Sequence, residues 1–450
     1  CDSHTRMAVS AHYLCVVLLL CIAAASARTT YEGFVVDSFQ LDTRVHAKEL
    51  VHMVEELGLD LWAEHVRYPG RVDVMVSPEQ QAKVERRSAL AGLKRTRAIV
   101  DVQASIDEHL AATAEAGATN STFFDTFRTN EEMNNYMADL AAQYPDLCGM
   151  FQIGTTLLGR PINGLRITAG SDEASQRFRT TALASGSSKP GMFLLGGQHA
   201  REWLGPMTVA YLAESLLRGY STDPAIQKLV EQFEYTVVPI ENADGYNYTW
   251  TEDRLWRKNL RQDTENCLGV DNNRNWDVAW GTVGISFVPC SNEYCGTEPF
   301  SEPEESAVAE YMAQMGNFQG FIDFHAYGQL YMAPYGFTPD ATPDADLQLT
   351  AGDIASAAIY QVNGLNFTVG PIYSDVYPSS GDSGDWTYVA VDAVYSYGIE
   401  LRPDHAPGFI LLPSNIVPSG EEQMAGLVAL NNYMLKNPMP PQVGAKRHSL

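Results

Sequence analysis

Two histidines and one glutamate in this chain have the residue types and the spacing of an open metal site. His199 and Glu202 stand three residues apart, and His325 lies far downstream. Two imidazoles and one carboxylate form the ligand set that leaves the fourth position of a zinc ion open for water or substrate. A zinc ion held in this way can activate water or polarise a carbonyl group. The pattern His-x-x-Glu alone arises often by chance. The surrounding sequence therefore has to show whether these residues bind a metal.

Both histidines follow apolar segments that begin with glycine. Residues 191–197 precede His199, and residues 320–324 precede His325. Short apolar runs of this kind are typical of buried strands in a largely parallel sheet. Side chains just beyond the carboxyl ends of such strands line the binding crevice of an open α/β sheet. We therefore expect both segments to deliver their ligands to one edge of the same sheet.

A further carboxylate ends a third β-rich segment. Residues 394–400 carry many aromatic and β-branched side chains and finish on Glu400. A carboxylate held near an activated water can take its proton and pass it to a leaving group. On its own, Glu400 is better explained as the solvated end of a strand.

The residues of five motifs, and the order of these motifs in the chain, resemble those of a known family. The motifs are residues 198–203 (QHAREW), 254–259 (RLWRKN), 271–276 (DNNRNW), 325–327 (HAY) and 400–402 (ELR). Together they resemble the zinc metallocarboxypeptidases of the pancreatic A/B type, over about Phe123 to Leu435, and a segment resembling the propeptide of that family precedes them. The resemblance implies an α/β fold with a mixed central sheet flanked by helices. It also implies a secreted proenzyme that hydrolyses the last peptide bond of a chain and releases single C-terminal residues.

The same resemblance assigns a metal site. It implies one Zn²⁺ per chain, bound by His199, Glu202 and His325. Asp271 matches the carboxylate of the family that orients the first histidine, a common arrangement around metal-bound imidazoles.

Catalytic and substrate-binding roles also follow from the resemblance. Glu400 is implied as the general base and later the proton shuttle, and Arg257 as the group that polarises the scissile carbonyl and stabilises the oxyanion. Asn273 and Arg274 are implied to hold the terminal carboxylate of the substrate, which a planar guanidinium binds in bidentate geometry. Tyr377 is implied to close over the bound end. Outer subsites are implied for Arg201, Tyr327 and Phe409.

The specificity pocket gives a divided signal. The position that is apolar in A-type enzymes and aspartate in B-type enzymes aligns with Gly384, which provides neither cue. Asp382 lies two residues earlier and could supply a charge, although a turn residue that caps its own loop explains it equally well. Ile372 and Val376 favour an apolar guest. We expect aliphatic or aromatic C-termini, with acceptance of Lys or Arg left open.

Composition excludes some functions. The 450 residues suffice for two or three domains, and 45% of them are hydrophobic, as in globular proteins. The formal net charge is −25, which argues against nucleic-acid binding because phosphate contacts need a basic surface. An acidic exterior fits a soluble secreted protein. We expect a monomer.

The N-terminus has the pattern of a secretory signal peptide. Residues 13–25 are apolar, and Ala25, Ser26 and Ala27 form a small-x-small cleavage site. We assign residues 1–27 to this signal, with residues 1–6 upstream of the expected start at Met7. The apolar run is short for a membrane span, so no membrane attachment is expected after cleavage, although a signal anchor stays open.

A secreted chain can form disulfides and carry glycans. The resemblance implies a disulfide between Cys267 and Cys290, and the loop-entropy model gives such a bridge about 3 kcal/mol of stabilisation. Cys148 and Cys295 either pair or remain buried thiols. Glycosylation sequons occur at Asn120, Asn247 and Asn366, with occupancy left open.

Chain organisation follows from turn signals and periodicity. Residues 28–102 are predicted to form a small α+β open sandwich of order β-α-β-α-β, which is the inhibitory propeptide in the resembling family. Its expected strands are 31–36, 72–76 and 99–102, and its expected helices are capped by Asp42 and Ser77 and stopped by Gly58 and Gly92. We assign residues 123–436 to the zinc carboxypeptidase domain and 437–450 to a loose tail.

Residues 103–122 connect the two predicted domains. Their Ala-rich part, 111–118, resembles the exposed helical linker that activating proteases cut. There is no Lys or Arg between Arg97 and Arg128, so trypsin has no site in this linker. The expected partners are an activating protease and the C-termini of peptides or proteins.

Two other functions stay open at this point. A zinc hydrolase acting on a different amide or ester would share the metal site, but Asn273 and Arg274 argue for a substrate with a free carboxylate. A catalytically silent binding protein on the same fold would be expected to lack a ligand or the base, and all four residues are present.

Overall fold

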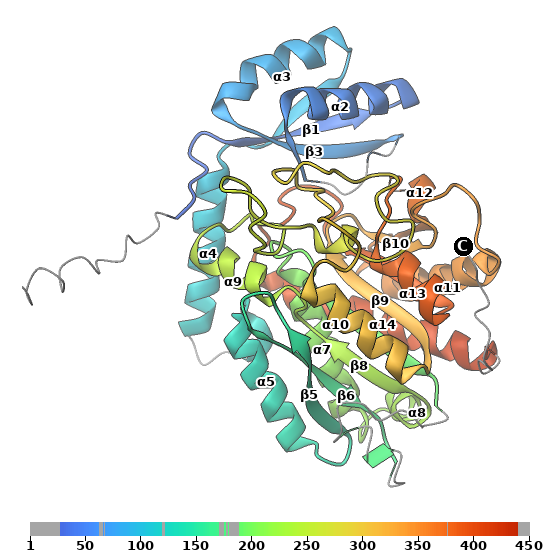
Figure 1. Cartoon of the computed structure of the whole chain (residues 1–450). Coiled ribbons are helices and arrows are strands. Elements are labelled where there is room, and N and C mark those ends of the chain that lie inside the picture. The colour runs from blue at the N-terminus through green and yellow to red at the C-terminus, as the bar shows by residue number, and fades with distance from the viewer. Residues whose placement is uncertain are drawn as a thin grey trace, which may run out of the picture.

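The computed structural model describes residues 28–62, 66, 68–118, 122–170, 175–176, 179, 189–375 and 377–439. A small N-terminal domain lies over one face of a larger α/β domain, and a long helix, α4, joins them along the side of the larger domain (Figure 1). The predicted signal peptide, the sequon at Asn120 and nearly all of the predicted tail lie outside the described residues. None of the described helices combines the length and apolarity needed to cross a membrane.

The small domain is an antiparallel sheet of order β2-β3-β1-β4 with two helices on its outer face (Figure 1). Its elements are β1 (Val35–Leu41), α2 (Arg44–Leu57), β2 (Asp60–Leu61), β3 (Gly70–Val76), α3 (Pro78–Leu90) and β4 (Lys94–Ile99). Apolar side chains such as Phe39, Leu50, Val72 and Val84 fill the space between helices and sheet. The predicted open sandwich is therefore present, with β2 as an extra short strand.

Two predicted strands of the small domain were placed wrongly. The first runs from Val35, not from residue 31. The last is Lys94–Ile99, and Val102 already begins α4. The charged residues of β4 concealed it, because Arg95 and Arg97 form ion pairs with the buried carboxylate of Asp37 on the neighbouring strand. The cap of α2 is also one residue later than predicted, since Thr43 accepts the hydrogen bond from the His46 amide.

The large domain is built on an eight-stranded sheet of order β11-β10-β12-β9-β7-β8-β6-β5. Neighbouring strands are parallel from β12 through β9 and β7 to β8, and antiparallel pairs flank this centre. The strands are β5 (Cys148–Thr155), β6 (Pro161–Ile167), β7 (Gly191–Gly196), β8 (Glu234–Val238), β9 (Phe318–Ala326), β10 (Leu330–Ala333), β11 (Thr368–Pro371) and β12 (Tyr395–Leu401). The mixed sheet matches the predicted fold class.

Helices cover both faces of this sheet, because successive side chains of each strand point to opposite sides. On β7, Met192 and Leu194 belong to the core shared with α7 and α14, whereas Phe193 and Leu195 pack with α10 and α13. The helices are α5 (Asn130–Gln143), α7 (Leu204–Gly219), α8 (Pro224–Gln232), α9 (Ala243–Thr251), α10 (Pro303–Met315), α11 (Ala345–Asn363), α12 (Ile372–Asp375), α13 (Ser383–Val391) and α14 (Ile416–Lys436). A full apolar core on both faces explains the continuous hydrophobic runs of the central strands.

The connector helix α4 (Val102–Ala118) is docked on the large domain along one face. Its buried residues Val102, Ile106, His109 and Thr113 recur every three or four positions, which is the spacing of a single helix face. Ala111 and Ala114 on the outer side are exposed. The prediction of an exposed helical linker therefore holds for the outer face of α4 only.

A long irregular segment between α9 and α10 carries the disulfide. Cys267 and Cys290 are bonded, as the resemblance implies. Cys148 and Cys295 are free thiols and both are buried. Residues 242–246 form the N-cap and first turn of α9, because the Asn242 side chain caps this helix by accepting from the Gly245 amide.

Candidate metal centre and binding cleft

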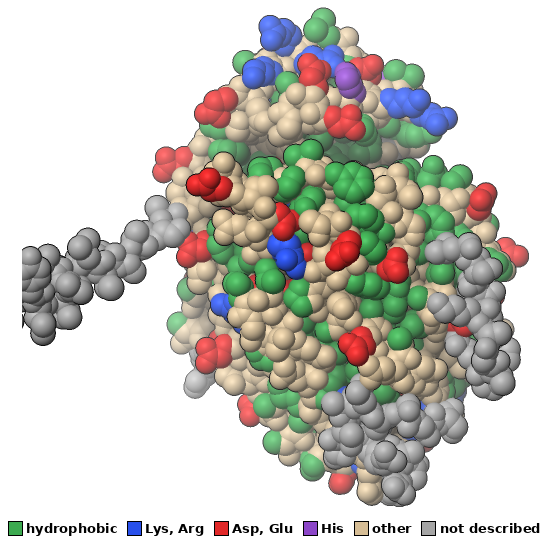
Figure 2. All heavy atoms as spheres, in the orientation of Figure 1, with side chains coloured by type: hydrophobic (Ala, Val, Ile, Leu, Met, Phe, Trp, Pro, Cys, Tyr) green, Lys and Arg blue, Asp and Glu red, His purple; other side chains and the backbone are tan. Residues whose placement is uncertain are grey.

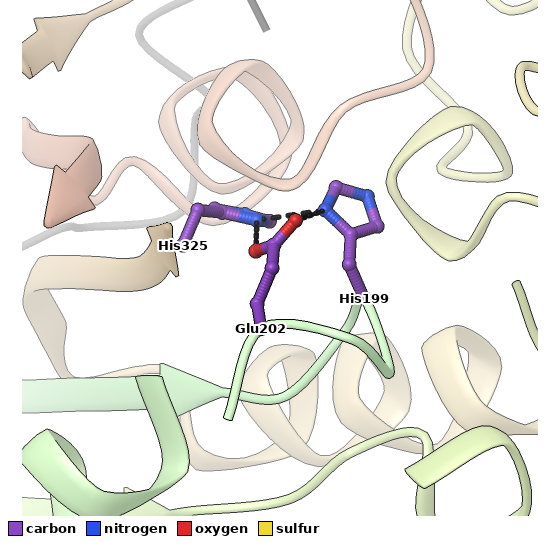
Figure 3. A group of neighbouring side chains, drawn as sticks. All are labelled: His199, Glu202 and His325. Carbon is purple, nitrogen blue, oxygen red and sulfur yellow. Dashed lines mark hydrogen bonds and ion pairs between the residues drawn. The ribbon is translucent and has the colours of Figure 1, made fainter. Parts of the chain in front are cut away.

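His199, Glu202 and His325 converge on one point at the carboxyl edge of the central strands (Figure 3). One ligand atom from each of the three lies within 4.8 Å of the others, and all three side chains are buried. The Nδ1 atoms of the two imidazoles are 3.0 Å apart. The two oxygens of Glu202 lie 2.9 Å from Nδ1 of His199 and 3.2 Å from Nδ1 of His325. The structure thus brings together residues that are 123 positions apart in the chain.

The backbone between β7 and α7 is shaped to present the first two ligands. Gly197 has φ +69° and lies against the backbone of Pro239 and Ile240, so a side chain there would be strained and crowded. Gly205 lets α7 approach β9 closely, because a Cβ there would be 2.5 Å from the Phe324 carbonyl oxygen. β7 and β9 are parallel neighbours, which places the ends of both strands at the same edge.

Each histidine is oriented by a carboxylate on its far side. Nε2 of His199 lies 3.1 Å from Oδ1 of Asp271, and Nε2 of His325 lies 2.8 Å from Oδ2 of Asp323. Sequence reasoning proposed Asp271 but missed Asp323. A signal was available, because Asp323 lies two residues before His325 on the same strand and alternate residues share a face.

The donor chemistry of this cluster fits zinc. With Nε2 of each ring at a carboxylate, the Nδ1 lone pairs are directed at the space beside Glu202. Burial by itself would raise the pKa of Glu202, but His199 and His325 lower it below the ordinary range. Burial would lower the pKa of His325, but Asp323 and Glu202 raise it well above its ordinary value. The buried carboxylates therefore make this a site that favours positive charge.

Glu400 and Arg257 flank the cluster. Glu400 is buried on β12, where it pairs in register with His325 of β9. Arg257 donates to Oδ2 of Asp271 at 3.0 Å and lies 3.8 Å from Glu202. Burial would raise the pKa of Asp271, but Arg257, Arg274 and His199 hold it well below the ordinary range. Arg257 is thereby fixed beside the three candidate ligands.

The residues expected to bind a substrate carboxylate lie in the same cleft. Arg274 donates to the carbonyl oxygens of Gly284, at 3.0 Å, and Asn273, at 2.6 Å, which fixes its guanidinium. Its remaining nitrogen hydrogen-bonds the hydroxyl of Tyr377. Asn273, Arg274, Tyr377 and Glu400 all line one small pocket next to His325. A cation fixed at the mouth of a pocket in this way can bind an anionic end group.

Three further predicted residues form a patch beside the cleft. The Arg201 guanidinium lies 4.2 Å from the centre of the Phe409 ring, and the Tyr327 and Phe409 rings are 5.1 Å apart. The small domain covers this patch. Asp60 forms an ion pair with Arg201 at 3.1 Å, and Asp73 accepts from the Tyr327 hydroxyl at 3.2 Å.

The pocket residues Gly384 and Asp382 stand at the start of α13. Oδ1 of Asp382 accepts from the Asp385 amide at 2.8 Å and so caps this helix. Burial raises the pKa of Asp382. Met332 and Ile372 give the pocket apolar walls, and Val376 lies outside the described residues.

Comparisons with known proteins bear on the family and the fold of the chain. A family model described as zinc carboxypeptidase matches residues 133–426, and one described as carboxypeptidase activation peptide matches residues 38–109. The chain is 33% identical to carboxypeptidase A1 of Rattus norvegicus over 398 residues, which cover 87% of this chain and 90% of that protein. It is 34% identical to zinc carboxypeptidase A 1 of Anopheles gambiae over 367 residues, 80% of each chain. Among solved structures, the carboxypeptidase A from Helicoverpa armigera is similar with a TM-score of 0.81, 25% identity and coverage of 91% of this chain and 99% of that one.

Proposed function

The chain belongs to the zinc carboxypeptidase family and carries its activation peptide, and on this premise we propose that it is the secreted zymogen of an exopeptidase that releases single residues from the C-termini of peptides and proteins. One observation carries the proposal. Arg274 and Glu400 line the same small pocket, beside the three candidate ligands. A fixed guanidinium selects a free terminal carboxylate, and a carboxylate next to a metal site can move the proton that hydrolysis requires.

The geometry supports a division of labour during hydrolysis. Zinc, when held by His199, Glu202 and His325, supplies a Lewis acid that activates water and polarises a carbonyl. Arg274 and Asn273 bind the terminal carboxylate of the substrate. This contact holds the last peptide bond next to Glu400 and so confines cleavage to the end of the chain.

Glu400 is assigned the proton transfer, and Arg257 the stabilisation of negative charge. Glu400 accepts a proton from the attacking water and returns it to the nitrogen of the leaving residue. Arg257, fixed by Asp271, stabilises the negative charge that develops on the carbonyl oxygen. Both side chains are buried, so their charges act in a medium that screens them weakly.

The position of the small domain supports inhibition of the zymogen. It occupies the approach to the cleft, where Asp60 holds Arg201 and Asn292 (Figure 1). A groove of about 560 Å³ remains between the two domains, with Val54 and Leu61 on one side and Ile285 on the other. Hydrophobic side chains are exposed on the large domain just below the small domain (Figure 2). Removal of the small domain would free Arg201 from Asp60 and open the approach to this apolar surface for a substrate.

The remaining features of the proposal come from the sequence. The predicted signal peptide supports secretion, the Ala-rich part of the linker supports a protease that cuts beside small residues, and a monomer stays a prediction. The expected preference for aliphatic or aromatic C-termini rests on apolar walls such as Ile372. The alternative is acceptance of Lys or Arg, and it rests on the buried carboxylate of Asp382.

A peptide panel tests the proposed activity. Purified protein is incubated with peptides that have free or amidated C-termini, before and after removal of the small domain, with and without a chelator. We expect release of single C-terminal residues from the free peptides only, after activation and in the absence of chelator. Equal cleavage of amidated peptides would show that the enzyme does not require a free C-terminus. Zinc binding with no release from any peptide would favour a silent binding protein.

A further inference from the structure

Ser383 lies between the metal centre and a side chain expected to bind the substrate carboxylate. It is the first residue of α13 and it is buried. Its hydroxyl donates to Oδ2 of Asp323 at 2.7 Å, and its backbone N–H donates to Oδ1 of Asn273 at 2.9 Å. One residue therefore contacts both the carboxylate behind His325 and an amide of the binding pocket.

The hydrogen bond from the backbone of Ser383 fixes which way the Asn273 side chain points. A backbone N–H can only donate, so the atom that faces it has to be the carbonyl oxygen of the asparagine. This N–H is available because the first N–H groups of a helix have no partner within the helix. Nδ2 of Asn273 therefore lies on the other side of the amide, 3.4 Å from Nε2 of His325, in a residue that lines the pocket.

Nε2 of His325 does not accept a hydrogen bond from this amide. With Nδ1 directed at the metal site, Nε2 carries the ring proton and donates to Oδ2 of Asp323 at 2.8 Å. Two donors then face each other across 3.4 Å, so Nδ2 of Asn273 is left for an acceptor that enters the pocket. A substrate carboxylate held by Arg274 is such an acceptor.

Three donors converge on a single oxygen of Asp323. Besides Ser383 and His325, the side-chain amide of Gln198 hydrogen-bonds Oδ2. Gln198 is itself held by the indole of Trp276, which donates to its Oε1 at 3.3 Å. Asp323 is 0% exposed, and its Oδ1 has no hydrogen-bond partner among the described residues. Bulk water therefore does not replace a donor that is removed here.

We propose that Ser383 and Gln198 are positioning residues that hold Asp323 so that His325 presents Nδ1 to zinc, and that Ser383 also sets Asn273 for the substrate carboxylate. The inference rests on the proposed function. A carboxylate with one donor can rotate about its last bond, whereas donors from three separate segments of the chain hold it in one orientation. The orientation of a metal-bound imidazole depends on such a partner.

The competing explanation is that Ser383 and Gln198 only satisfy a buried carboxylate and so stabilise the fold. Both explanations predict lower stability when a donor is lost. They differ in zinc affinity, which a purely structural role leaves unchanged. Ser419 provides the comparison, because it is a buried serine of α14 whose hydroxyl hydrogen-bonds that of Thr208 at 3.0 Å.

The first test measures the zinc affinity of the intact full chain by competition with a chelator, together with thermal unfolding. Ser383→Ala and Gln198→Met each remove one donor from Asp323. Each should weaken zinc binding by about 10-fold, the lower end of the usual cost of losing an outer partner of a metal site. Ser419→Ala should keep the zinc affinity of the parent. Parent-like zinc affinity in Ser383→Ala and Gln198→Met would overturn the inference.

The second test follows hydrolysis of peptides with a free C-terminus after proteolytic activation, at saturating zinc. Ser383→Ala keeps the amide that holds Asn273, so kcat should fall while KM stays close to that of the parent. Ser383→Pro removes the amide as well. Proline is tolerated at the first helical position, and the extended backbone of the preceding Asp382 (φ −95°, ψ 157°) is compatible with it. KM for Ser383→Pro should exceed that for Ser383→Ala by about 10-fold.

Equal KM values for Ser383→Ala and Ser383→Pro would overturn the part that concerns Asn273. Asn273→Asp checks this part without a proline. Its carboxylate still accepts from the Ser383 amide but has no donor, so KM should rise at least as far, and an unchanged KM would contradict the orientation of Asn273. A parent enzyme that binds zinc but cleaves no peptide would count against the proposed function, whereas the zinc affinities decide the metal part of the inference by themselves.

Discussion

Glu400 of β12 lies directly beside His325 of β9 in the parallel pairing of the two strands. Neighbours in register on adjacent strands project to the same face of a sheet, so this pairing fixes the candidate base next to a candidate ligand. The relationship comes from backbone hydrogen bonds within the core of the sheet. It therefore persists whether or not the cleft is covered by the small domain.

The first prediction follows from this pairing. Glu400→Gln should retain zinc and lose turnover by on the order of 100- to 10,000-fold, because an amide cannot accept the proton from water. Zinc content and kcat should be measured on the same activated sample. Glu421→Gln, at an exposed position of α14, is the matched control. Near-normal turnover in Glu400→Gln would place the base elsewhere.

Metal affinity should depend on Asp323 as well as on the three candidate ligands. Asp323→Asn should weaken zinc binding by about 10- to 100-fold, because His325 loses the carboxylate that orients it. Glu202→Gln should weaken binding further, since an amide is a poorer zinc ligand than a carboxylate. Competition with a chelator, read by metal analysis, gives both affinities. Full zinc affinity in Asp323→Asn would remove this residue from the support of the site.

Arg274→Ala should impair recognition of the terminal carboxylate more than it affects the metal. The guanidinium donates to Gly284, Asn273 and Tyr377, so we expect zinc content to be unchanged. We expect a large rise in KM for peptides with a free C-terminus. If the variant and the parent show the same KM, the carboxylate is bound by other residues.

Trypsin should fail to activate the precursor cleanly. Residues 98–127 contain no Lys or Arg, and both flanking arginines are engaged. Arg97 is paired with Asp37 at 2.6 Å, and Arg128 donates to the Phe123 carbonyl oxygen at 2.9 Å. A protease that prefers small residues should cut better, in the region of residues 111–118.

Sequencing of the N-terminus of the active product tests the activation prediction. An N-terminus between about residues 110 and 123 would support processing beside small residues. An N-terminus at Ala98 or Thr129 would indicate tryptic processing and contradict the prediction.

Docking of α4 should weaken in acid because of His109. This side chain is buried against Trp203 and Phe127, accepts from Arg254 at 3.3 Å and lies 2.6 Å from the Leu411 carbonyl oxygen. Burial and the Arg254 charge lower the pKa of His109 to about 3. A lowered pKa means that the undocked state binds the proton more readily. The contribution of neutral His109 is therefore present above about pH 6.5 and is lost as the pH falls from there toward 3.

The slope within that window is up to about 1.4 kcal/mol per pH unit. Thermal unfolding of the intact zymogen between pH 7 and pH 4 measures it. His109→Gln should flatten the pH dependence, whereas His52→Gln, at an exposed position of α2, should not. Identical pH profiles for the parent and His109→Gln would contradict this account.

Much of the site follows from residue types that the chemistry requires. The resemblance of five short motifs to a known family named His199, Glu202, His325 and Arg274 before their positions were known. The fold class could also be predicted, because buried parallel strands need continuous apolar runs such as residues 191–197. These features are local in the chain, and local patterns are what a sequence displays directly.

The tertiary structure decided what depends on contacts between distant segments. β4 could not be recognised from its charged residues, because its partner Asp37 lies about 60 positions away in the chain. The same holds for the covering of Arg201 by Asp60 and for the joint position of Asp382 and Asp323 in one pocket. Each of these relationships is a contact between side chains that are far apart in the chain and come together only when the protein folds. Periodicity and spacing along the chain carry no information about such distances.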